Sequence, residues 1–137
     1  MTIETMQVED YESLMALWKR SDGVGLSGAD SRESLEKFLQ RNPGLSFVLK
    51  DRDRIAGSIM AGHDGRRGHL YHLSVLEEYR RRGWGRDLVE RCIEALRREG
   101  IEKCHLFVFK SNGEARKFWK ASGWTEREDI QAFSKMT

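Results

Sequence analysis

The chain has 137 residues, a net charge of +2 and 34% charged residues, with basic and acidic side chains nearly balanced. This length suits one domain with a single core, and the mixed charge excludes a polybasic nucleic-acid-binding tract. No apolar run reaches the length of a membrane span, and the first residues lack the apolar core of a signal peptide. We therefore expect one cytoplasmic domain over residues 1–137.

Hydrophobic periodicity predicts alternating strands and helices in the first half of the chain. A loop with three glycines over 21–28 separates two helices, and Asp30 with Glu33 resembles a capping box that opens the second one. The charged turn 51–53 predicts a hairpin. The expected elements are strands over 2–6, 45–50 and 54–62, and helices over 8–20 and from Asp30 to the stop at 42–44.

The second half predicts a central strand, two helices and further strands. The expected ranges are strands over 69–76, 103–109, 124–126 and 131–135, and helices over 83–99 and 112–122. This order predicts an α/β fold with a mixed, mostly antiparallel sheet of six to seven strands and helices on both faces. Cys92 lies on an apolar helix face and Cys104 in an apolar strand, so we expect two buried thiols and no metal.

The turn after the central strand concentrates the basic excess of the chain. A helix N-terminus offers unpaired N–H groups to phosphate, and glycines let the phosphate approach the backbone. Arginines add charge-assisted donors. We expect a pyrophosphate-binding turn made of Arg80, Arg81, Arg82, Gly83, Trp84, Gly85 and Arg86.

Two common phosphate motifs do not match this turn. The chain has no GxxxxGK[ST], and Leu88 stands where a dinucleotide fingerprint needs its third glycine. The turn resembles instead the Arg/Gln-x-x-Gly-x-Gly/Ala motif of the GNAT superfamily of acyl-CoA-dependent N-acyltransferases. The matching residues are Arg80, Gly83 and Gly85.

A second stretch resembles the other GNAT signature, in which an Asn and an Ala precede an aromatic pair, a glycine and a bulky aromatic residue. The matching residues are Asn112, Ala115, Phe118, Trp119, Gly123 and Trp124. Both stretches also look similar to ribosomal-protein N-terminal acetyltransferases. The resemblance implies acetyl transfer from acetyl-CoA to a primary amine, by direct attack in a ternary complex. The amine is a protein N-terminus, a lysine or a small molecule.

The resemblance also implies where the partners bind. In the GNAT fold the parallel strands that here end near Val75 and begin at Lys103 splay apart, and acyl-CoA lies in the opening. Residues implied to contact the co-substrate, besides those of the turn, are Leu73, Ser74, Val75, Asn112, Ala115 and Phe118. Acyl-CoA and an amine acceptor are the expected partners, without nucleic acid or membrane, for a monomer or homodimer.

Catalysis requires an oxyanion donor and a base. The backbone N–H of Val75 is the expected donor, with an ordinary strand hydrogen bond as the alternative. Strict alternation places His69, Tyr71 and Leu73 on one strand face and His72 on the other, which argues against a metal pair of histidines. His69 stands where many GNAT enzymes carry a glutamate, so it is the candidate base, directly or through water; the alternative is a solvent-facing strand cap. Tyr71 is a further candidate catalytic residue.

Trp119 departs from the family pattern. Many members carry a tyrosine there that is thought to protonate the leaving thiolate, whereas an indole donates a hydrogen bond without supplying a proton. Either the loss of this acid is tolerated because a thiol is a fair leaving group, or the chain is a non-catalytic acyl-CoA sensor. If its role is packing alone, Trp119 is expected to be a core aromatic residue beside Phe118.

Overall fold

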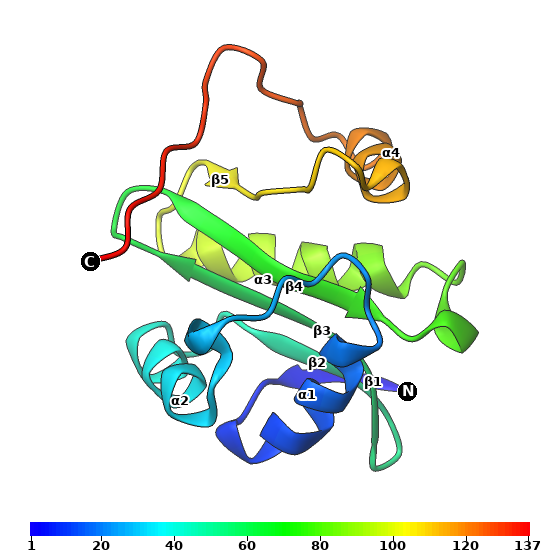
Figure 1. Ribbon diagram of the computed structural model, residues 1–137. Coiled ribbons are helices and arrows are strands. Elements are labelled where there is room, and N and C mark those ends of the chain that lie inside the picture. The colour runs from blue at the N-terminus through cyan, green and yellow to red at the C-terminus, as the bar shows by residue number, and fades with distance from the viewer. The chain divides into compact units, whose positions relative to one another are not determined.

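The computed structural model describes residues 1–137, which divide into two compact units, 1–107 and 108–137. Each unit is described by itself. The first unit contains the strands β1 (Thr2–Thr5), β2 (Phe47–Asp51), β3 (Arg54–His63), β4 (Gly68–Val75) and β5 (Cys104–His105), labelled in Figure 1. Its helices are α1 (Tyr11–Lys19), α2 (Arg32–Arg41) and α3 (Trp84–Arg98), with the 3₁₀ turns η1 (Val8–Asp10), η2 (Gly28–Asp30) and η3 (Glu77–Tyr79).

The five strands form one sheet in the order β1-β2-β3-β4-β5. The first three pairings are antiparallel, and β4 pairs with β5 in parallel. The mixed, mostly antiparallel sheet is thus confirmed, but the expected six to seven strands are wrong. Residues 124–126 and 131–135 form no strand, and the strand expected over 103–109 pairs only at Cys104 and His105. An apolar pattern cannot show where a strand loses its partner.

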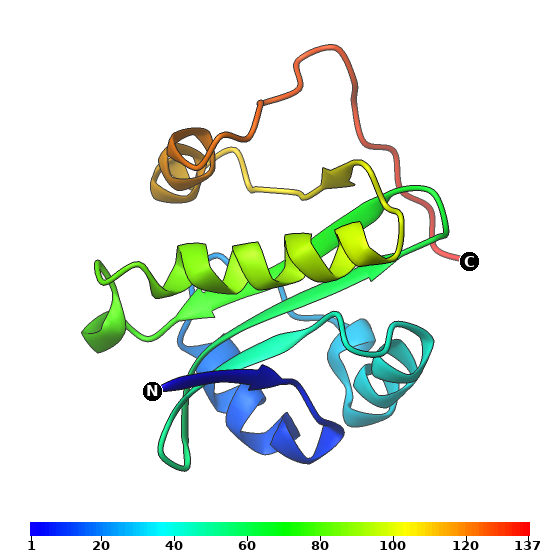
Figure 2. The ribbon, with the colours of Figure 1, turned by 180° about the vertical axis from the view of Figure 1, so that it is seen from behind.

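Helices cover both faces of the sheet, as expected (Figures 1 and 2). On one face, Trp18 of α1 donates its indole N–H to the Ser58 hydroxyl of β3 over 3.0 Å. On the other face, a Cβ added at the neighbouring Gly57 would lie 3.4 Å from Leu88 of α3. Because successive strand residues point to opposite faces, α1 and α3 pack on opposite sides. Trp18, Ser58 and Leu88 are fully buried in the core between these layers.

A bulge in β4 overturns the strict alternation expected for this strand. Ser58 of β3 is opposite Ser74, and Met60 is opposite Tyr71, so two residues of β4, His72 and Leu73, face one residue of β3. His72 adopts a φ of 52°, in the left-handed region. As a result the His72 ring contacts Trp18 of α1, and the Tyr71 ring contacts Phe38 of α2. Both side chains therefore lie on the face that α1 and α2 cover.

The prediction that Asp30 opens the second helix as its cap is also wrong. Asp30 belongs to the preceding turn η2, where its carboxylate accepts from the Ser27 N–H over 3.0 Å. Ser31 caps α2 instead, and its hydroxyl accepts from the Ser34 N–H over 3.1 Å. Two caps therefore follow each other in the sequence, one for η2 and one for α2. In the first, only Oδ2 of Asp30 accepts the Ser27 N–H, and Oδ1 remains available.

The second unit contains one helix, α4 (Gly113–Ala121), close to the range expected. The Asn112 side chain accepts from the Ala115 N–H over 3.1 Å, so it is the N-cap. Gly123 follows the helix with a φ of 91°, a conformation that suits a glycine at a helix end. The signature over 112–124 therefore has a structural meaning of its own, as a capped helix with a glycine stop.

Candidate active site

The turn expected to hold pyrophosphate opens α3. Gly83 is the N-cap with a φ of 85°, which favours glycine, and no side chain caps the helix. The first intrahelical bond runs from the Asp87 N–H to the Gly83 carbonyl. The preceding N–H groups of the first turn thus have no protein side chain to satisfy them, and they carry the partial positive charge of the helix terminus. The uncapped helix terminus thus lies at the turn for which the sequence predicts anion binding.

The turn is tied to the rest of the sheet by hydrogen bonds of η3. The buried Tyr79 donates its phenol to Asp51 over 2.7 Å, and this bond raises the pKa of the Tyr79 hydroxyl. Arg54 pairs with Glu78 over 2.9 Å. Both contacts join η3 to the β2–β3 hairpin, so the basic turn is held in place. The exposed basic side chains beside it are Arg80, Arg81, Arg82 and Arg86.

The amide of Val75 points away from β3. The next residue, Leu76, donates its N–H to the Ala56 carbonyl over 2.8 Å. Hydrogen-bonded and non-hydrogen-bonded pairs alternate in an antiparallel ladder, so Val75 and its partner Gly57 form a non-hydrogen-bonded pair. The N–H of Val75 is therefore directed to the side of β4 on which β5 lies.

The pairing of β4 with β5 ends well before Val75. The only paired positions are Gly68 with Cys104 and His69 with His105. Beyond them, β4 continues to Val75 without a neighbour in the sheet on that side. The expected parallel pair is thus confirmed, and the ordinary strand hydrogen bond for the Val75 N–H has no strand to accept it.

His69 lies in a group of rings on the α2 side of the sheet. Its imidazole stacks on Tyr71 with ring centres 6.2 Å apart, and its ring centre lies 5.8 Å from that of His105 and 6.3 Å from that of Phe107. Tyr71 is 39% exposed, and partial burial raises the pKa of its hydroxyl. His69 itself is half-buried and has no carboxylate partner. The structure therefore brings both catalytic candidates of this strand together.

Two other residues of β4 are less open. Leu73 is half-buried, and Ser74 is buried with its hydroxyl in contact with the Ser21 hydroxyl after α1. The Ser74 side chain thus fastens the end of α1 to the strand. The Ser74 hydroxyl is thus engaged within the protein, whereas Leu73 is partly accessible.

The candidates of the second unit lie together on α4. Phe118 and Trp119 form an edge-to-face pair with ring centres 5.0 Å apart, and Trp119 forms another with Trp124 at 5.1 Å. The Trp124 N–H also donates to the Trp119 carbonyl over 3.0 Å. Within this unit Trp119 lies beside Phe118, as expected, but it is only half-buried and is not a core residue. Asn112 and Ala115 are joined by the helix cap.

A carboxylate–imidazole pair lies outside the residues that the sequence predicted for the site. Nε2 of His72 lies 2.6 Å from Oδ1 of Asp30, and the two side chains are only 16% and 8% exposed. No spacing rule links residues 42 positions apart, and the strand alternation placed His72 on the wrong face. The one available signal was the chemistry of Asp30 and His72 themselves, because buried ionisable residues require partners.

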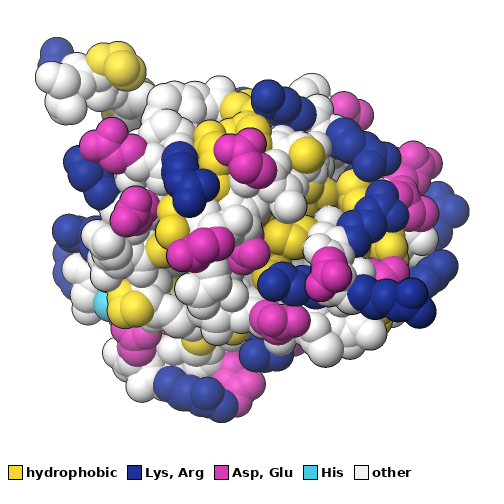
Figure 3. Space-filling view, turned by 90° about the horizontal axis from the view of Figure 1, so that it is seen from below, with side chains coloured by type: hydrophobic (Ala, Val, Ile, Leu, Met, Phe, Trp, Pro, Cys, Tyr) yellow, Lys and Arg dark blue, Asp and Glu magenta, His cyan; other side chains and the backbone are white.

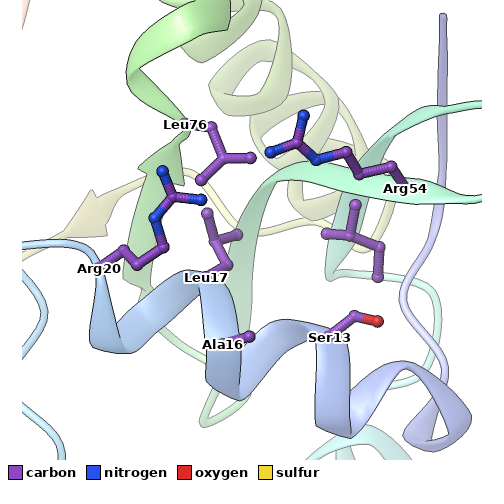
Figure 4. A pocket seen from close by; sticks show the side chains of 7 residues that line it. Ser13, Ala16, Leu17, Arg20, Arg54 and Leu76 are labelled. Carbon is purple, nitrogen blue, oxygen red and sulfur yellow. The ribbon is translucent and has the colours of Figure 1, made fainter.

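A separate hollow of about 190 Å³ lies between α1, β3 and the end of β4 (Figure 4). Arg20 and Arg54 point toward it from opposite sides, over the apolar Leu17 and Leu76. It contains none of the predicted site residues, and it is smaller than the pockets that usually hold even a drug-sized ligand. We do not assign acyl-CoA to it.

The net charge of +2 with 34% charged residues implies a surface of mixed sign. The face in Figure 3 shows acidic and basic side chains interspersed. No three His, Cys, Asp or Glu side chains are grouped to hold a metal ion. None of the helices is long and apolar enough to cross a membrane.

Comparison with known proteins decides the family. Residues 11–124 match the acetyltransferase (GNAT) family model. This chain belongs to the GNAT family of acetyltransferases. An acetyltransferase of Pectobacterium atrosepticum is 34% identical over 112 residues, which are 82% of this chain and 79% of that protein.

Solved structures of low identity share the GNAT fold. Ard1 from Thermoplasma volcanium has a TM-score of 0.79 at 21% identity, over 90% of this chain and 82% of that one. A structure of AAC(6′)-Iy with the bisubstrate analogue CoA-S-monomethyl-acetylneamine has a TM-score of 0.77 at 20% identity, over 99% and 98% of the two chains. The family match spans both compact units of the chain.

Proposed function

We propose that the protein transfers an acetyl group from acetyl-CoA to a primary amine, by direct attack in a ternary complex, and that residues 1–137 act as one catalytic domain. The observation that carries this proposal is the junction of β4 and α3. There, a strand end with an unpaired Val75 N–H is followed, after η3 and the basic turn, by an uncapped helix N-terminus. Such a junction offers hydrogen bonds to a thioester carrier at one end and to its pyrophosphate at the other.

The residues present fit coenzyme A. The basic side chains Arg80, Arg81, Arg82 and Arg86 supply donors beside the N-terminus of α3, and Gly83, Trp84 and Gly85 supply backbone N–H groups. The backbone of Leu73, Ser74 and Val75 has no neighbouring strand on one side and can pair with the pantetheine amides. From the second unit, Asn112, Ala115 and Phe118 are the proposed contacts.

Acetyl transfer requires that the amine lose a proton and that the charge on the carbonyl oxygen be stabilised. The Val75 N–H is the proposed donor to that oxygen. His69, or a water that it orders, is the base that the sequence proposes, with Tyr71 stacked on it. Positioning both reactants in one ternary complex supplies a large part of the rate.

Trp119 stands where many family members have a tyrosine acid, and this difference is what favours the alternative function, a non-catalytic acyl-CoA sensor. Thiol release from acetyl-CoA in the presence of an amine panel tests this distinction, because a sensor releases none above the buffer rate. Trp119→Tyr introduces the family's usual acid. A higher turnover in this variant means that protonation of the thiolate limits the rate, and an unchanged turnover assigns the limit to another step.

The acceptor is proposed at the level of a primary amine. Ard1 and AAC(6′)-Iy share this fold, and the ligand of the latter joins coenzyme A to an acetylated neamine. A protein N-terminus of the ribosomal-protein type, a lysine and a small amine are therefore the three classes for the panel. A cytoplasmic location, and a monomer or homodimer, are part of the same proposal.

Thermal unfolding with acetyl-CoA tests the binding step. A ligand that binds only the folded state at 100 times its Kd stabilises that state by about 2.7 kcal/mol, which raises the Tm by about 5–10 °C for a domain of this size. A Tm that stays constant up to millimolar acetyl-CoA contradicts the proposal. If His69 is the base, His69→Ala reduces acetyl transfer without changing this Tm shift, whereas unchanged turnover across pH removes His69 from the mechanism.

A further inference from the structure

The pair of His72 and Asp30 has the arrangement of a base and its orienting carboxylate. Oδ1 of Asp30 lies 2.6 Å from Nε2 of His72, and Oδ2 accepts from the Ser27 N–H over 3.0 Å. With both oxygens engaged, the carboxylate is held in one position. An ionised carboxylate accepts hydrogen bonds only, so the imidazole proton lies on Nε2, and Nδ1 of the neutral ring carries a lone pair.

That second nitrogen is open. Nδ1 of His72 has no hydrogen-bond partner in the protein. Arg116 Nε is the fully buried side-chain nitrogen that lacks a partner, so Nδ1 of His72 is not fully buried. It is therefore accessible from solvent although most of the ring is covered. Packing in the core does not require a histidine to have a buried carboxylate at one nitrogen and a solvent-accessible lone pair at the other.

The backbone at His72 is held in an uncommon conformation. Its φ of 52° costs about 1–2 kcal/mol relative to ordinary strand geometry. Without the bulge, His72 would point to the α3 face, and the Asp30 contact would be lost. Strained positions of this kind concentrate at functional sites, where the surrounding structure compensates for them.

The position relative to Val75 suits proton removal. His72 precedes Val75 by three residues on the same strand, a separation of about 10 Å or less along the backbone. Proton removal by His72 requires that an amine attacking a carbonyl held by the Val75 N–H reach Nδ1, directly or through water. His69 lies three residues further from Val75 and lacks a carboxylate partner, so it is less well placed.

We propose that His72, oriented by Asp30, is the general base of this acetyltransferase; this inference rests on the proposed function. Nδ1 takes one proton from the acceptor ammonium, and the free amine nitrogen attacks the thioester carbon. The C–N bond forms and the C–S bond breaks, with the bonding electrons leaving on the thiolate. The second amine proton is transferred to that thiolate, and the imidazolium returns its proton to solvent. Asp30 is a positioning residue that stabilises the imidazolium.

The charged and titratable groups around His72 come from several elements. Asp30 contacts it from η2, while α1 contributes the neutral Trp18 ring and β3 contributes the Ser58 hydroxyl, which contacts the His72 carbonyl. The other titratable rings of this sheet face are those of His69, Tyr71 and His105. The pH profile of the reaction is therefore to be measured with His69→Ala in parallel.

The test uses His72→Gly, because glycine adopts the positive φ of the bulge without strain and leaves space for a free imidazole. Thiol release with the best amine of the panel is expected to fall by about 10²-fold or more in kcat, with the KM for acetyl-CoA unchanged. Added imidazole is expected to restore part of the rate. A merely structural histidine gives no such rescue.

Asp30→Asn keeps the shape of the side chain and removes its charge. We expect a lower kcat and a pH–rate profile that differs from that of the wild type, because the charge beside the imidazole is lost. Glu99→Gln is the matched control, since Glu99 also pairs with a histidine, His63, over 2.7 Å, but on the exposed surface. It is expected to leave both kcat and the profile unchanged.

The outcomes separate the two proposals. If the wild-type protein releases no thiol with any amine, the proposed function fails. If the wild type is active and His72→Gly keeps its kcat, or loses it without rescue while Asp30→Asn keeps the wild-type pH profile, the assignment of His72 is wrong and the proposed function stands. A circular-dichroism spectrum and an acetyl-CoA Tm shift equal to those of the wild type show that each variant is folded.

Discussion

Nε of Arg80 donates to the carbonyl of Val75 over 2.7 Å. This bond joins the first arginine of the basic turn to the strand end whose N–H points toward the unpaired side of β4. The proposed thioester and pyrophosphate contacts are therefore parts of one rigid junction. Several expected outcomes depend on it.

Arg80→Lys tests this junction. Lysine keeps the charge but lacks the planar guanidinium. In arginine, one N–H of that group can donate to the Val75 carbonyl while the others remain free for a phosphate. We expect the KM for acetyl-CoA to rise about tenfold, measured by thiol release, with a smaller effect on kcat. Arg98→Lys is the control, because Arg98 is exposed and pairs only with Glu94 within α3. Equal KM values for the two variants would remove the junction from co-substrate binding.

Gly83→Ala tests the N-terminus of α3. The φ of 85° makes a side chain costly there by about 1–2 kcal/mol, which corresponds to about a 10-fold loss if the strain distorts the anion site. We expect weaker acetyl-CoA binding by calorimetry. Gly100→Ala at the other end of the same helix has a φ of 82° and equally open surroundings. It should cost similar stability while leaving the Kd for acetyl-CoA unchanged; a shared loss of affinity would mean that the effect is one of stability.

Arg52→Gly is expected to stabilise the protein. Arg52 is the first of two residues that connect β2 to β3, and its φ of 59° is unfavourable for arginine. Relief of this strain is expected to raise the free energy of unfolding by about 1 kcal/mol, measured by urea denaturation. Asp53→Gly, beside it, lacks a positive φ to relieve and should lower stability. The same sign for both variants would contradict this explanation.

The two thiols are expected to be unreactive in the folded protein. Burial raises the pKa of the Cys92 thiol, and it raises the pKa of Cys104 to about 11. At pH 8 only about 0.1% of Cys104 is then thiolate, so its alkylation is expected to be over a hundredfold slower than that of a free cysteine. Mass spectrometry after iodoacetamide treatment measures this. Rapid labelling before unfolding would show that Cys104 is more open than the structure has it.

The sequence predicted the parts of the fold that local signals control. Gly83 and Gly100 bound α3, and Asn112 and Gly123 bound α4, because caps and left-handed glycines act within one turn. The basic turn followed from its local motif, and the parallel strand pair followed from the resemblance to the GNAT family. These features position the proposed co-substrate site.

The features that the sequence did not predict depend on tertiary contacts. The bulge at His72 breaks a period of two with a single residue, and nothing in the local pattern marks it. Asp30 was interpreted as a helix cap because the cap is local, whereas its partner His72 lies 42 residues away. The apolar stretch after Lys103 predicted a long strand, but β4 pairs with it at only two positions. The proposed base therefore became visible only in the structure.

A ¹H–¹⁵N correlation spectrum recorded during titration with acetyl-CoA tests the central claim most directly. We predict that the amide signals of Val75 and of residues 83–86 shift most within residues 1–107, because these N–H groups face the ligand. Signals that do not move at saturating acetyl-CoA, or the largest shifts at the Arg20 and Arg54 hollow instead, would contradict the assignment of the β4–α3 junction as the acetyl-CoA site.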